Sequence, residues 1–194
     1  MSAADESIRQ GMNADIEQMD RIIGQFLDFA RAGEAGERAE PTGIDAMVEE
    51  ALEHYGKLGH ALQAELGCGV SLPARPKALR RALANLIDNA LRYGREPVGI
   101  RTGLRGSEVL IEVLDRGPGI PNSERERMKL PFTRLEPARS GSGGSELGLA
   151  IVERIARAHG GRVEFDGREG GGLTARLVLS VHGCEPSRRA GASG

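Results

Sequence analysis

Two asparagines stand four residues apart in the segment NLIDNALRY, residues 85–93, and an arginine and a tyrosine end the segment. On a helix, at about 100° per residue, Asn85, Asn89, Arg92 and Tyr93 form one polar stripe beside an apolar face. An amide oxygen is a hard neutral ligand that suits Mg²⁺, which takes its remaining ligands from water and phosphate oxygens. The same spacing also fits two surface asparagines that bind nothing, so the stripe alone leaves both interpretations open.

A second candidate is the segment DRGPGI, residues 115–120, which directly follows a run of alternating apolar residues. Asp115 would therefore lie at the end of a strand, where its carboxylate can accept a hydrogen bond from an exocyclic amine such as that of adenine. Gly117 and Gly119 would allow the backbone to approach a flat ring closely. The spacing Asp-x-Gly-x-Gly also fits an ordinary turn.

A third candidate is SGSGGSELGLAIV, residues 140–152, in which a glycine-rich turn leads into an apolar helical pattern. Free backbone N–H groups and the helix dipole make such a helix start an anion site. The segment is not a P-loop, because no Gly-Lys-Ser/Thr follows the glycines, and it does not follow an early strand as a dinucleotide-binding turn would. A glycine-rich loop alone is weak evidence for phosphate binding.

The elements that must position these residues follow from the hydrophobic spacing. The asparagine segment belongs to a predicted helix over 76–93, and Pro76 suits its first turn. Alternating apolar residues predict a pair of strands, 98–105 and 108–115, and the second strand ends at the aspartate.

The segment 116–143 is rich in Gly, Pro, Ser and Arg, and it lacks a sustained hydrophobic period. It is too long for a passive connection, so we predict a functional lid. A helix over 145–159 follows, with His159 at its C-terminal end. The last predicted strands, 161–167 and 173–181, form a hairpin around the turn REGGG.

Before the asparagine helix, apolar residues recur at spacings of three and four over residues 8–30, which predicts a coiled-coil seam on one helix. Such a helix needs a second helix, either from this chain or from another copy. A linker is predicted over 34–41. Thr42 and Asp45 resemble a capping box that opens a helix over 43–58. The remaining predicted strands are 61–66 and 69–73.

The composition of the 194 residues excludes some classes of function. The net charge is −2, the aromatic content is 3% and tryptophan is absent, so we expect no nucleic-acid binding. No run approaches 18 apolar residues, so we expect no membrane contact by this chain. The two cysteines match no metal-binding spacing, which favours free thiols in a reducing compartment.

In their order along the chain, these segments resemble the ATP-binding domain of sensor histidine kinases, a group related to gyrase B and Hsp90-type ATPases. NLIDNALRYG, DRGPGI, PFTRLE and the glycine-rich segment resemble the family's N, G1, F and G2 boxes. The forms of the first and third are most similar to EnvZ-type kinases, which act on OmpR-like response regulators. The resemblance covers about residues 8–182 and implies an α+β fold, a two-layer α/β sandwich of the Bergerat type preceded by a coiled-coil helix.

The resemblance implies that the chain binds ATP and Mg²⁺. Asn89 would be the Mg²⁺ ligand, and Asn85 would contact phosphate or metal. Arg92 would neutralise phosphate charge, and these three would be the catalytic residues. Asp115 would accept a hydrogen bond from the adenine amine. The other residues that the resemblance assigns to ATP binding are Tyr93, Gly117, Gly119, Ile120, Phe132, Arg134, Gly144, Ser145, Leu147, Gly148 and Leu149.

The resemblance also implies how the chain is organised. Residues 1–33 would be the second helix of a dimerisation hairpin, which would form a homodimer through residues 8–30. A linker (34–41), the ATP-binding catalytic domain (42–183) and a disordered tail (184–194) would follow. The chain would form the cytoplasmic portion of an inner-membrane sensor.

The family's phosphoacceptor is a histidine followed by an acidic residue on the first helix of that hairpin. His54, His60, His159 and His182 all lack this context. For His54 and His60 we expect surface or capping roles. We therefore expect the phosphoryl group to pass to a histidine supplied in trans, so that this chain alone does not autophosphorylate.

One residue departs from the family's G2 pattern, because Glu146 stands where the pattern has glycine. Its charge near phosphate would weaken nucleotide binding, or it would point to solvent at the start of its helix, where an acid is favoured. Two functions therefore stand beside the kinase. One is a regulatory interaction module with an impaired nucleotide site. The other, less expected, is a gyrase-type or Hsp90-type ATPase, whose general-base glutamate is replaced here by Asn85.

Overall fold

The computed structural model describes residues 9, 12, 16, 24, 37–133 and 147–182. Three α-helices, two short 3-10 turns and seven strands lie in the segments 37–133 and 147–182. The helices are α2 (Ile44–Lys57), α3 (Pro76–Tyr93) and α4 (Gly148–Ala158), and the turns are η1 (Asn122–Glu124) and η2 (Arg127–Lys129). The strands are β1 (Glu40–Gly43), β2 (Gln63–Glu65), β3 (Ser71–Ala74), β4 (Gly99–Arg105), β5 (Glu108–Leu114), β6 (Arg162–Gly167) and β7 (Leu173–Ser180).

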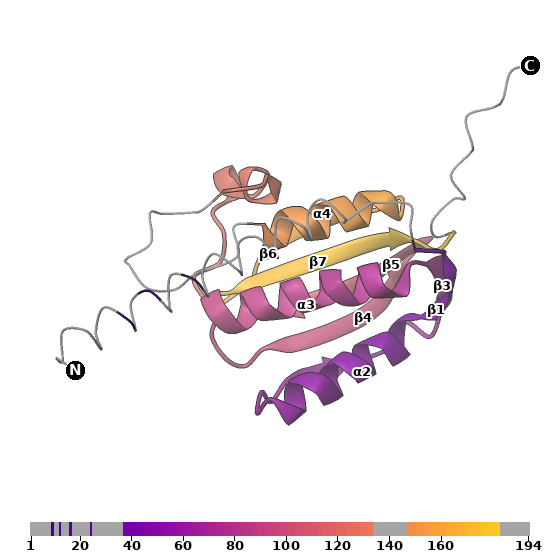
Figure 1. Ribbon diagram of the computed structural model, residues 1–194, viewed down its shortest axis with the longest axis horizontal. Coiled ribbons are helices and arrows are strands. Elements are labelled where there is room, and N and C mark those ends of the chain that lie inside the picture. Colours follow the sequence, from indigo (N-terminus) through magenta and orange to yellow (C-terminus); the bar gives the residue numbers. More distant parts are fainter. Residues whose placement is uncertain are drawn as a thin grey trace, which may run out of the picture.

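Five of the strands form a mixed sheet in the order β2-β4-β5-β7-β6, and the three helices lie across one face of it (Figure 1). Strands β2 and β4 run parallel, whereas the other neighbours in this sheet pair antiparallel. Strands β1 and β3 form a separate antiparallel pair. The predicted two-layer α+β arrangement is therefore confirmed.

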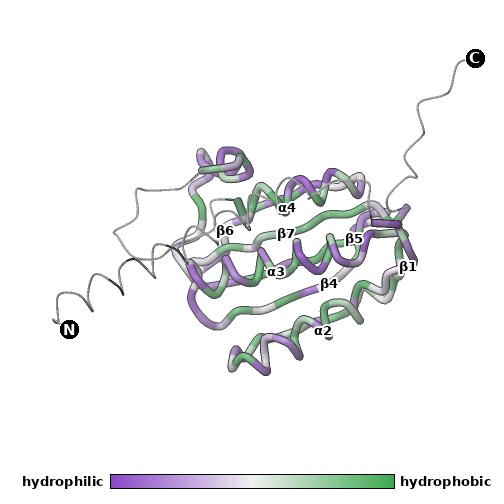
Figure 2. Tube along the Cα trace, viewed as in Figure 1, coloured by the Kyte–Doolittle hydropathy of each residue, from purple (hydrophilic) through white to green (hydrophobic). Residues whose placement is uncertain are grey.

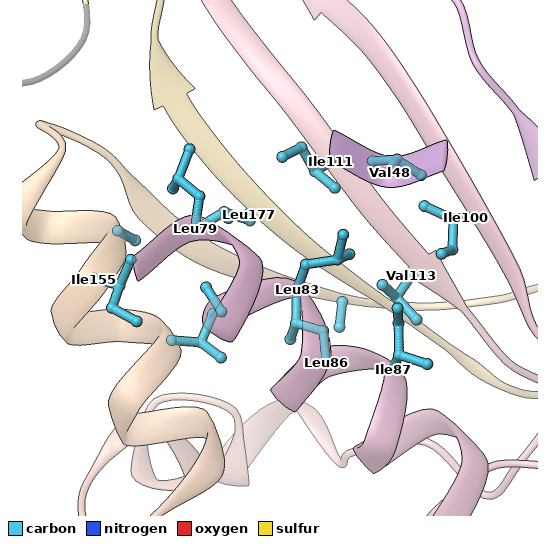
Figure 3. Packing of buried hydrophobic residues seen from close by; sticks show 14 of the residues in the cluster. Val48, Leu79, Leu83, Leu86, Ile87, Ile100, Ile111, Val113, Ile155 and Leu177 are labelled. Carbon is cyan, nitrogen blue, oxygen red and sulfur yellow. The ribbon is translucent and has the colours of Figure 1, made fainter. Parts of the chain in front are cut away.

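Helix α3 lies at the centre of the helical layer, and its sequence explains why. Pro76 stands in the first turn, as predicted, and apolar residues recur at helical spacing, which gives the alternating bands of colour along the tube in Figure 2. Leu79, Leu83 and Leu86 are almost completely buried, and Figure 3 shows them between the sheet and α4. Each such leucine contributes about 1.5–3 kcal/mol relative to an exposed one.

The start of the domain differs from the sequence prediction. Thr42 belongs to β1, and its hydroxyl donates to the Glu40 carbonyl over 3.0 Å. Gly43 is the residue that precedes α2, and no side chain caps the helix. The predicted capping box is therefore wrong, because strand pairing holds Thr42 away from the helix. The Asp45 carboxylate accepts instead from the Gly69 N–H and the Thr102 hydroxyl.

The other predicted elements can be compared over the described residues. Helix α3 and the two predicted hairpins are confirmed, with small shifts of their ends. Strand β1 was not predicted, and it begins inside the predicted linker 34–41. Helix α4 begins at Gly148, three residues later than predicted. The predicted helix over 8–30 falls outside the described residues except at four positions, all of them helical, and the tail 184–194 falls outside them entirely.

The sheet face opposite the helices carries charged side chains that pair across the strands. Arg176 of β7 contacts Glu112 of β5 over 2.6 Å and Glu164 of β6 over 2.9 Å. Burial would raise the pKa of Glu164, but hydrogen bonds from Arg105, Arg176 and Arg162 outweigh it and lower that pKa to about 2. This face is therefore neutralised by its own ion pairs, and the hydrophobic core lies on the helical face.

His159 follows α4 directly, as predicted, and its side chain is completely buried. Its Nε2 accepts from the Arg75 N–H over 3.0 Å, and its Nδ1 lies 2.7 Å from the Ile155 carbonyl oxygen. A neutral ring with the proton on Nδ1 satisfies both contacts. Because Arg75 precedes the first residue of α3, the ring joins the end of α4 to the start of α3. Burial lowers the pKa of His159.

This contact predicts a pH dependence of stability. Since the pKa of His159 in the folded chain lies below its ordinary value of 6.5, the unfolded chain binds a proton first as the pH falls. The contact should contribute its full stability above that value, and the free energy of unfolding should fall as the pH drops below it. His159→Gln, which cannot titrate, should flatten this part of the curve in urea unfolding. The exposed His182→Gln is the control, and equal slopes in His159→Gln and the unchanged chain would contradict the assignment.

Candidate functional site

The predicted polar stripe lies along the second half of α3. Asn85 and Asn89 are half-buried, and Arg92 and Tyr93 are exposed. The Nδ2 atom of Asn85 donates to the Arg81 carbonyl over 2.9 Å, which leaves its Oδ1 to accept or to ligate. Within the described part of the chain, no hydrogen bond engages the Asn89 carboxamide. The two amides therefore have oxygen atoms available at the border of the core.

Asp115 directly follows β5, as predicted, and its side chain is 5% exposed. Its Oδ1 accepts from the Gly117 N–H over 2.6 Å. Of the described residues, none donates a hydrogen bond to Oδ2. The carboxylate is thus held in one orientation by its own loop, with one oxygen left to accept from a ligand.

Backbone contact brings the end of α3 against residues 115–119, which we term the 115–119 loop. A Cβ atom on Gly117 would lie 2.6 Å from the Gly94 Cα and 2.8 Å from the Tyr93 carbonyl oxygen. A Cβ on Gly94 would lie 2.6 Å from the Asp115 Cβ. Gly117 therefore lies directly against the end of α3, and its approach to a flat ring stays a prediction. The contact places the end of α3 against Asp115. We term the stripe of Asn85, Asn89, Arg92 and Tyr93 on this helix the asparagine face.

The remaining predicted site residues fall on both sides of a gap in the described chain. Ile120 is half-buried against the core, whereas Phe132 is 61% exposed with a φ angle of 62°. Leu147 is buried before α4, and Gly148 is the first residue of that helix. Leu149 packs against the core. Arg134, Gly144, Ser145 and Glu146 lie outside the described residues.

The fold and this geometry agree with what comparison with known proteins finds. Residues 74–183 match the family described as histidine kinase-, DNA gyrase B- and HSP90-like ATPase. The chain belongs to this ATPase family. The predicted resemblance to histidine kinase ATP-binding domains and the predicted fold class are therefore confirmed.

Two similar proteins are named as histidine kinases, and a third structure shares the fold. The sensor histidine kinase GtrS of Pseudomonas aeruginosa is 31% identical over 182 residues, which cover 93% of this chain and 37% of that protein. The histidine kinase domain of the Escherichia coli osmosensor EnvZ is 32% identical with a TM-score of 0.59, over 83% of this chain and 98% of that structure. Full-length ShkA in complex with AMPPNP shares the fold, with a TM-score of 0.70 at 23% identity over 96% of this chain and 40% of that one.

These relatives favour the kinase prediction over the regulatory-module alternative. The chain spans less than half the length of the curated relatives it matches. In the described residues, no helix has both the length and the apolar composition needed to cross a membrane.

Sequence reasoning missed a second support of the 115–119 loop, the turn between β6 and β7. Arg168 Nη1 donates to the Asp115 carbonyl over 2.8 Å, and Arg116 Nη1 donates to the Glu169 carbonyl over 2.8 Å. A Cβ on Gly172 would overlap the Asp115 carbonyl oxygen. We interpreted REGGG only as a hairpin turn. Three consecutive glycines were the available signal of a close backbone approach.

Sequence reasoning also missed the contact that fixes α2 against α3. The Tyr55 hydroxyl donates to the Asp88 carboxylate over 2.6 Å, and burial, followed by the contact with Asp88, raises the pKa of Tyr55. Asp88 precedes Asn89, so the contact sets the position of the asparagine face. The exposed rings of His54 and His60 flank Tyr55, as expected for surface histidines.

The contact between α3 and the 115–119 loop predicts an effect of filling its space. Gly117→Ala should destabilise the chain by about 1–3 kcal/mol, because the added methyl group meets rigid backbone. Gly103→Ala on β4 is a matched control with nothing within 4 Å of the added Cβ, and should change stability by less than about 0.5 kcal/mol. Thermal or urea unfolding measures both. Equal stability of the two variants would show that the close approach is absent in solution.

Proposed function

We propose that this chain carries the catalytic domain of a two-component sensor histidine kinase. The domain transfers the γ-phosphoryl group of ATP to a histidine on a dimerisation helix supplied in trans, for relay to an OmpR-like response regulator. The observation that carries the proposal is the backbone contact between Asp115 and the end of α3, the helix that bears the asparagine face, in a chain of this ATPase family.

In the proposed complex, Asp115 recognises the adenine base. A carboxylate only accepts hydrogen bonds, so it pairs with the exocyclic amine of adenine and opposes a carbonyl at the same position. Its Oδ1 is occupied by the Gly117 N–H, which leaves Oδ2 for the amine. The loop thus holds the acceptor before ATP binds, which lowers the ordering cost of binding.

The asparagine face fits Mg²⁺ bound together with ATP. The asparagines supply amide oxygens, hard ligands that suit Mg²⁺ when water and phosphate oxygens complete its coordination. We propose Asn89 as the Mg²⁺ ligand. The contact with Arg81 does not use the Oδ1 atom of Asn85, so we propose that Asn85 contacts phosphate or the metal. When bound, Mg²⁺ would neutralise phosphate charge during transfer.

Arg92 and Tyr93 extend the same face, and we propose that they contact phosphate and nucleotide. Gly148 opens α4, where the first N–H groups of a helix favour anions. The rest of the proposed ATP site consists of Gly117, Gly119, Ile120, Phe132, Arg134, Gly144, Ser145, Leu147 and Leu149.

The proposed organisation places the second dimerisation helix in residues 1–33, the linker in 34–41, the catalytic domain in 42–183 and a disordered tail in 184–194. Two residues of the predicted seam, Met12 and Ile16, are 58% and 53% exposed, which supports pairing with another helix. We therefore propose a homodimer through residues 8–30, in the cytoplasmic portion of a membrane sensor.

The asparagine face predicts the effect of removing one amide. Asn89→Ala should lower phosphoryl transfer by about a hundredfold, because transition-state charge loses a positioned group. The assay mixes this chain, ATP and Mg²⁺ with a separately made dimerisation hairpin that carries the phosphoacceptor histidine. Asn122→Ala in η1 is the control for an asparagine outside the proposed site. Equal transfer by Asn89→Ala and the unchanged chain would refute the assigned role of Asn89, and no transfer by the unchanged chain would refute the kinase activity.

Replacing Glu146, which departs from the G2 pattern, is expected to change the affinity for ATP. A carboxylate about 5 Å from a phosphate charge is repelled by about 3 kcal/mol at an effective dielectric near 20, which corresponds to about two decades of affinity. Glu146→Gln and Glu146→Gly should therefore both bind a nonhydrolysable ATP analogue more tightly in calorimetry. A gain in Glu146→Gly alone would trace the cost to backbone conformation. No gain in either variant would mean that the side chain points to solvent.

A further inference from the structure

The main chain of Asp115 is held at both of its polar groups by the second hairpin. Its N–H donates to the Leu173 carbonyl over 3.0 Å. Its carbonyl oxygen accepts from Arg168 Nη1 over 2.8 Å. Arg168 follows β6 and Leu173 begins β7, so the two contacts come from opposite ends of the connection between these strands. We term residues 168–172 the β6–β7 turn.

The support is reciprocal, because the loop also holds the turn. Arg116 Nη1 donates to the Glu169 carbonyl over 2.8 Å and lies 3.4 Å from the Gly171 carbonyl oxygen. Gly170, Gly171 and Gly172 all have positive φ angles, of 77°, 95° and 114°. This backbone path, which side chains rarely adopt, brings Gly172 directly against the Asp115 carbonyl. The turn and the 115–119 loop are therefore joined by contacts in both directions.

Arg168 differs from the other arginines of this hairpin in what it contacts. Arg162 and Arg176 pair with carboxylates on the outer face of the sheet, whereas Arg168 donates to the backbone carbonyl of Asp115 beside the site. Burial, and then repulsion from Arg116, lower the pKa of Arg168, while the negative charge of Asp115 opposes that shift.

We propose that Arg168 is a positioning residue that sets the base selectivity of the nucleotide site. It acts through Asp115, whose proposed role toward adenine this inference assumes. With its carbonyl, its N–H and its Oδ1 all bound, Asp115 presents Oδ2 at one fixed place. A purine with an amino group at position 6 can donate a hydrogen bond to this oxygen. A purine with an oxo group at position 6 places a second acceptor against it, and the two oxygens repel each other. Discrimination of this kind depends on how firmly the buried polar group is held.

The test compares two nonhydrolysable analogues, one of ATP and one of GTP, bound by the full chain with Mg²⁺ in calorimetry. Arg168→Gln removes the charge and the fork of donors. It should weaken binding of the ATP analogue about tenfold while binding of the GTP analogue changes little, so that the ratio of the two affinities falls. Arg168→Lys keeps a charge without the planar fork of donors. Its ratio of affinities should lie between the ratios of Arg168→Gln and the unchanged chain. Arg162→Gln removes an arginine of the same hairpin and should leave the ratio unchanged.

A second measurement needs no nucleotide. Hydrogen exchange of the Asp115 and Gly117 amides, which are bonded to Leu173 and to the Asp115 carboxylate, should be faster in Arg168→Gln than in the unchanged chain. The same amides should exchange at the parent rate in Arg162→Gln. Together with the affinity ratio, faster exchange separates positioning from a general loss of stability.

The outcomes separate this inference from the proposed function. If Asp115→Asn abolishes the preference for the ATP analogue but Arg168→Gln keeps the parent ratio and the parent exchange rates, the inference is wrong and the proposed function stands. If the unchanged chain binds neither analogue, both are wrong. A lower ratio in Arg168→Gln with a parent ratio in Arg162→Gln supports the assignment.

Discussion

The candidate site depends on one backbone contact, the approach of the 115–119 loop to the end of α3. Neither Gly94 nor Gly117 has room for a Cβ atom, and the Arg116 N–H donates to the Arg95 carbonyl over 2.9 Å at the same place. A strand supplies the carboxylate, and a helix supplies the amides. These groups come from different layers of the sandwich, so only contact between the layers can bring them together. Two glycines make that contact possible.

The contact is maintained because α3 is fixed along its whole length. At its start, the Glu37 carboxylate accepts from the Lys77 N–H over 2.8 Å and from the Ala78 N–H over 3.1 Å. The buried ring of His159 holds the residue before the helix. In the middle, Tyr55 binds Asp88. A neutral hydrogen bond adds about 1 kcal/mol and one to a charged group about 1.5–3 kcal/mol, whereas α3 buries seven residues, four of them leucine or isoleucine that contribute about 1.5–3 kcal/mol each. The core therefore provides the stability of the helix, and the polar contacts determine its position.

Local patterns predicted what depends on local geometry. The apolar period of α3, the alternation of β4 and β5, and the polar stripe beside the core were all readable, because side-chain direction repeats with the period of the element. Sequence prediction failed where a residue far away in the chain determines the local structure or the contact. Thr42 fits a capping box in sequence, but pairing of β1 with β3 holds it in a strand. Arg168 contacts a residue 53 positions away, and no spacing within REGGG identifies that partner.

The glycines of the 115–119 loop have close protein neighbours that sequence reasoning did not identify. We predicted a close approach at Gly117 and Gly119 and assigned it to a flat ring. The space at Gly117 is filled by α3, and a Cβ on Gly119 would lie 3.0 Å from the Gly172 carbonyl oxygen. Because helix and turn support the loop in this way, its freedom is lost when the protein folds and not when a ligand binds. In the proposed complex, the affinity for a base would then depend on residues such as Gly94 and Gly172, which pack against Asp115 in the folded chain.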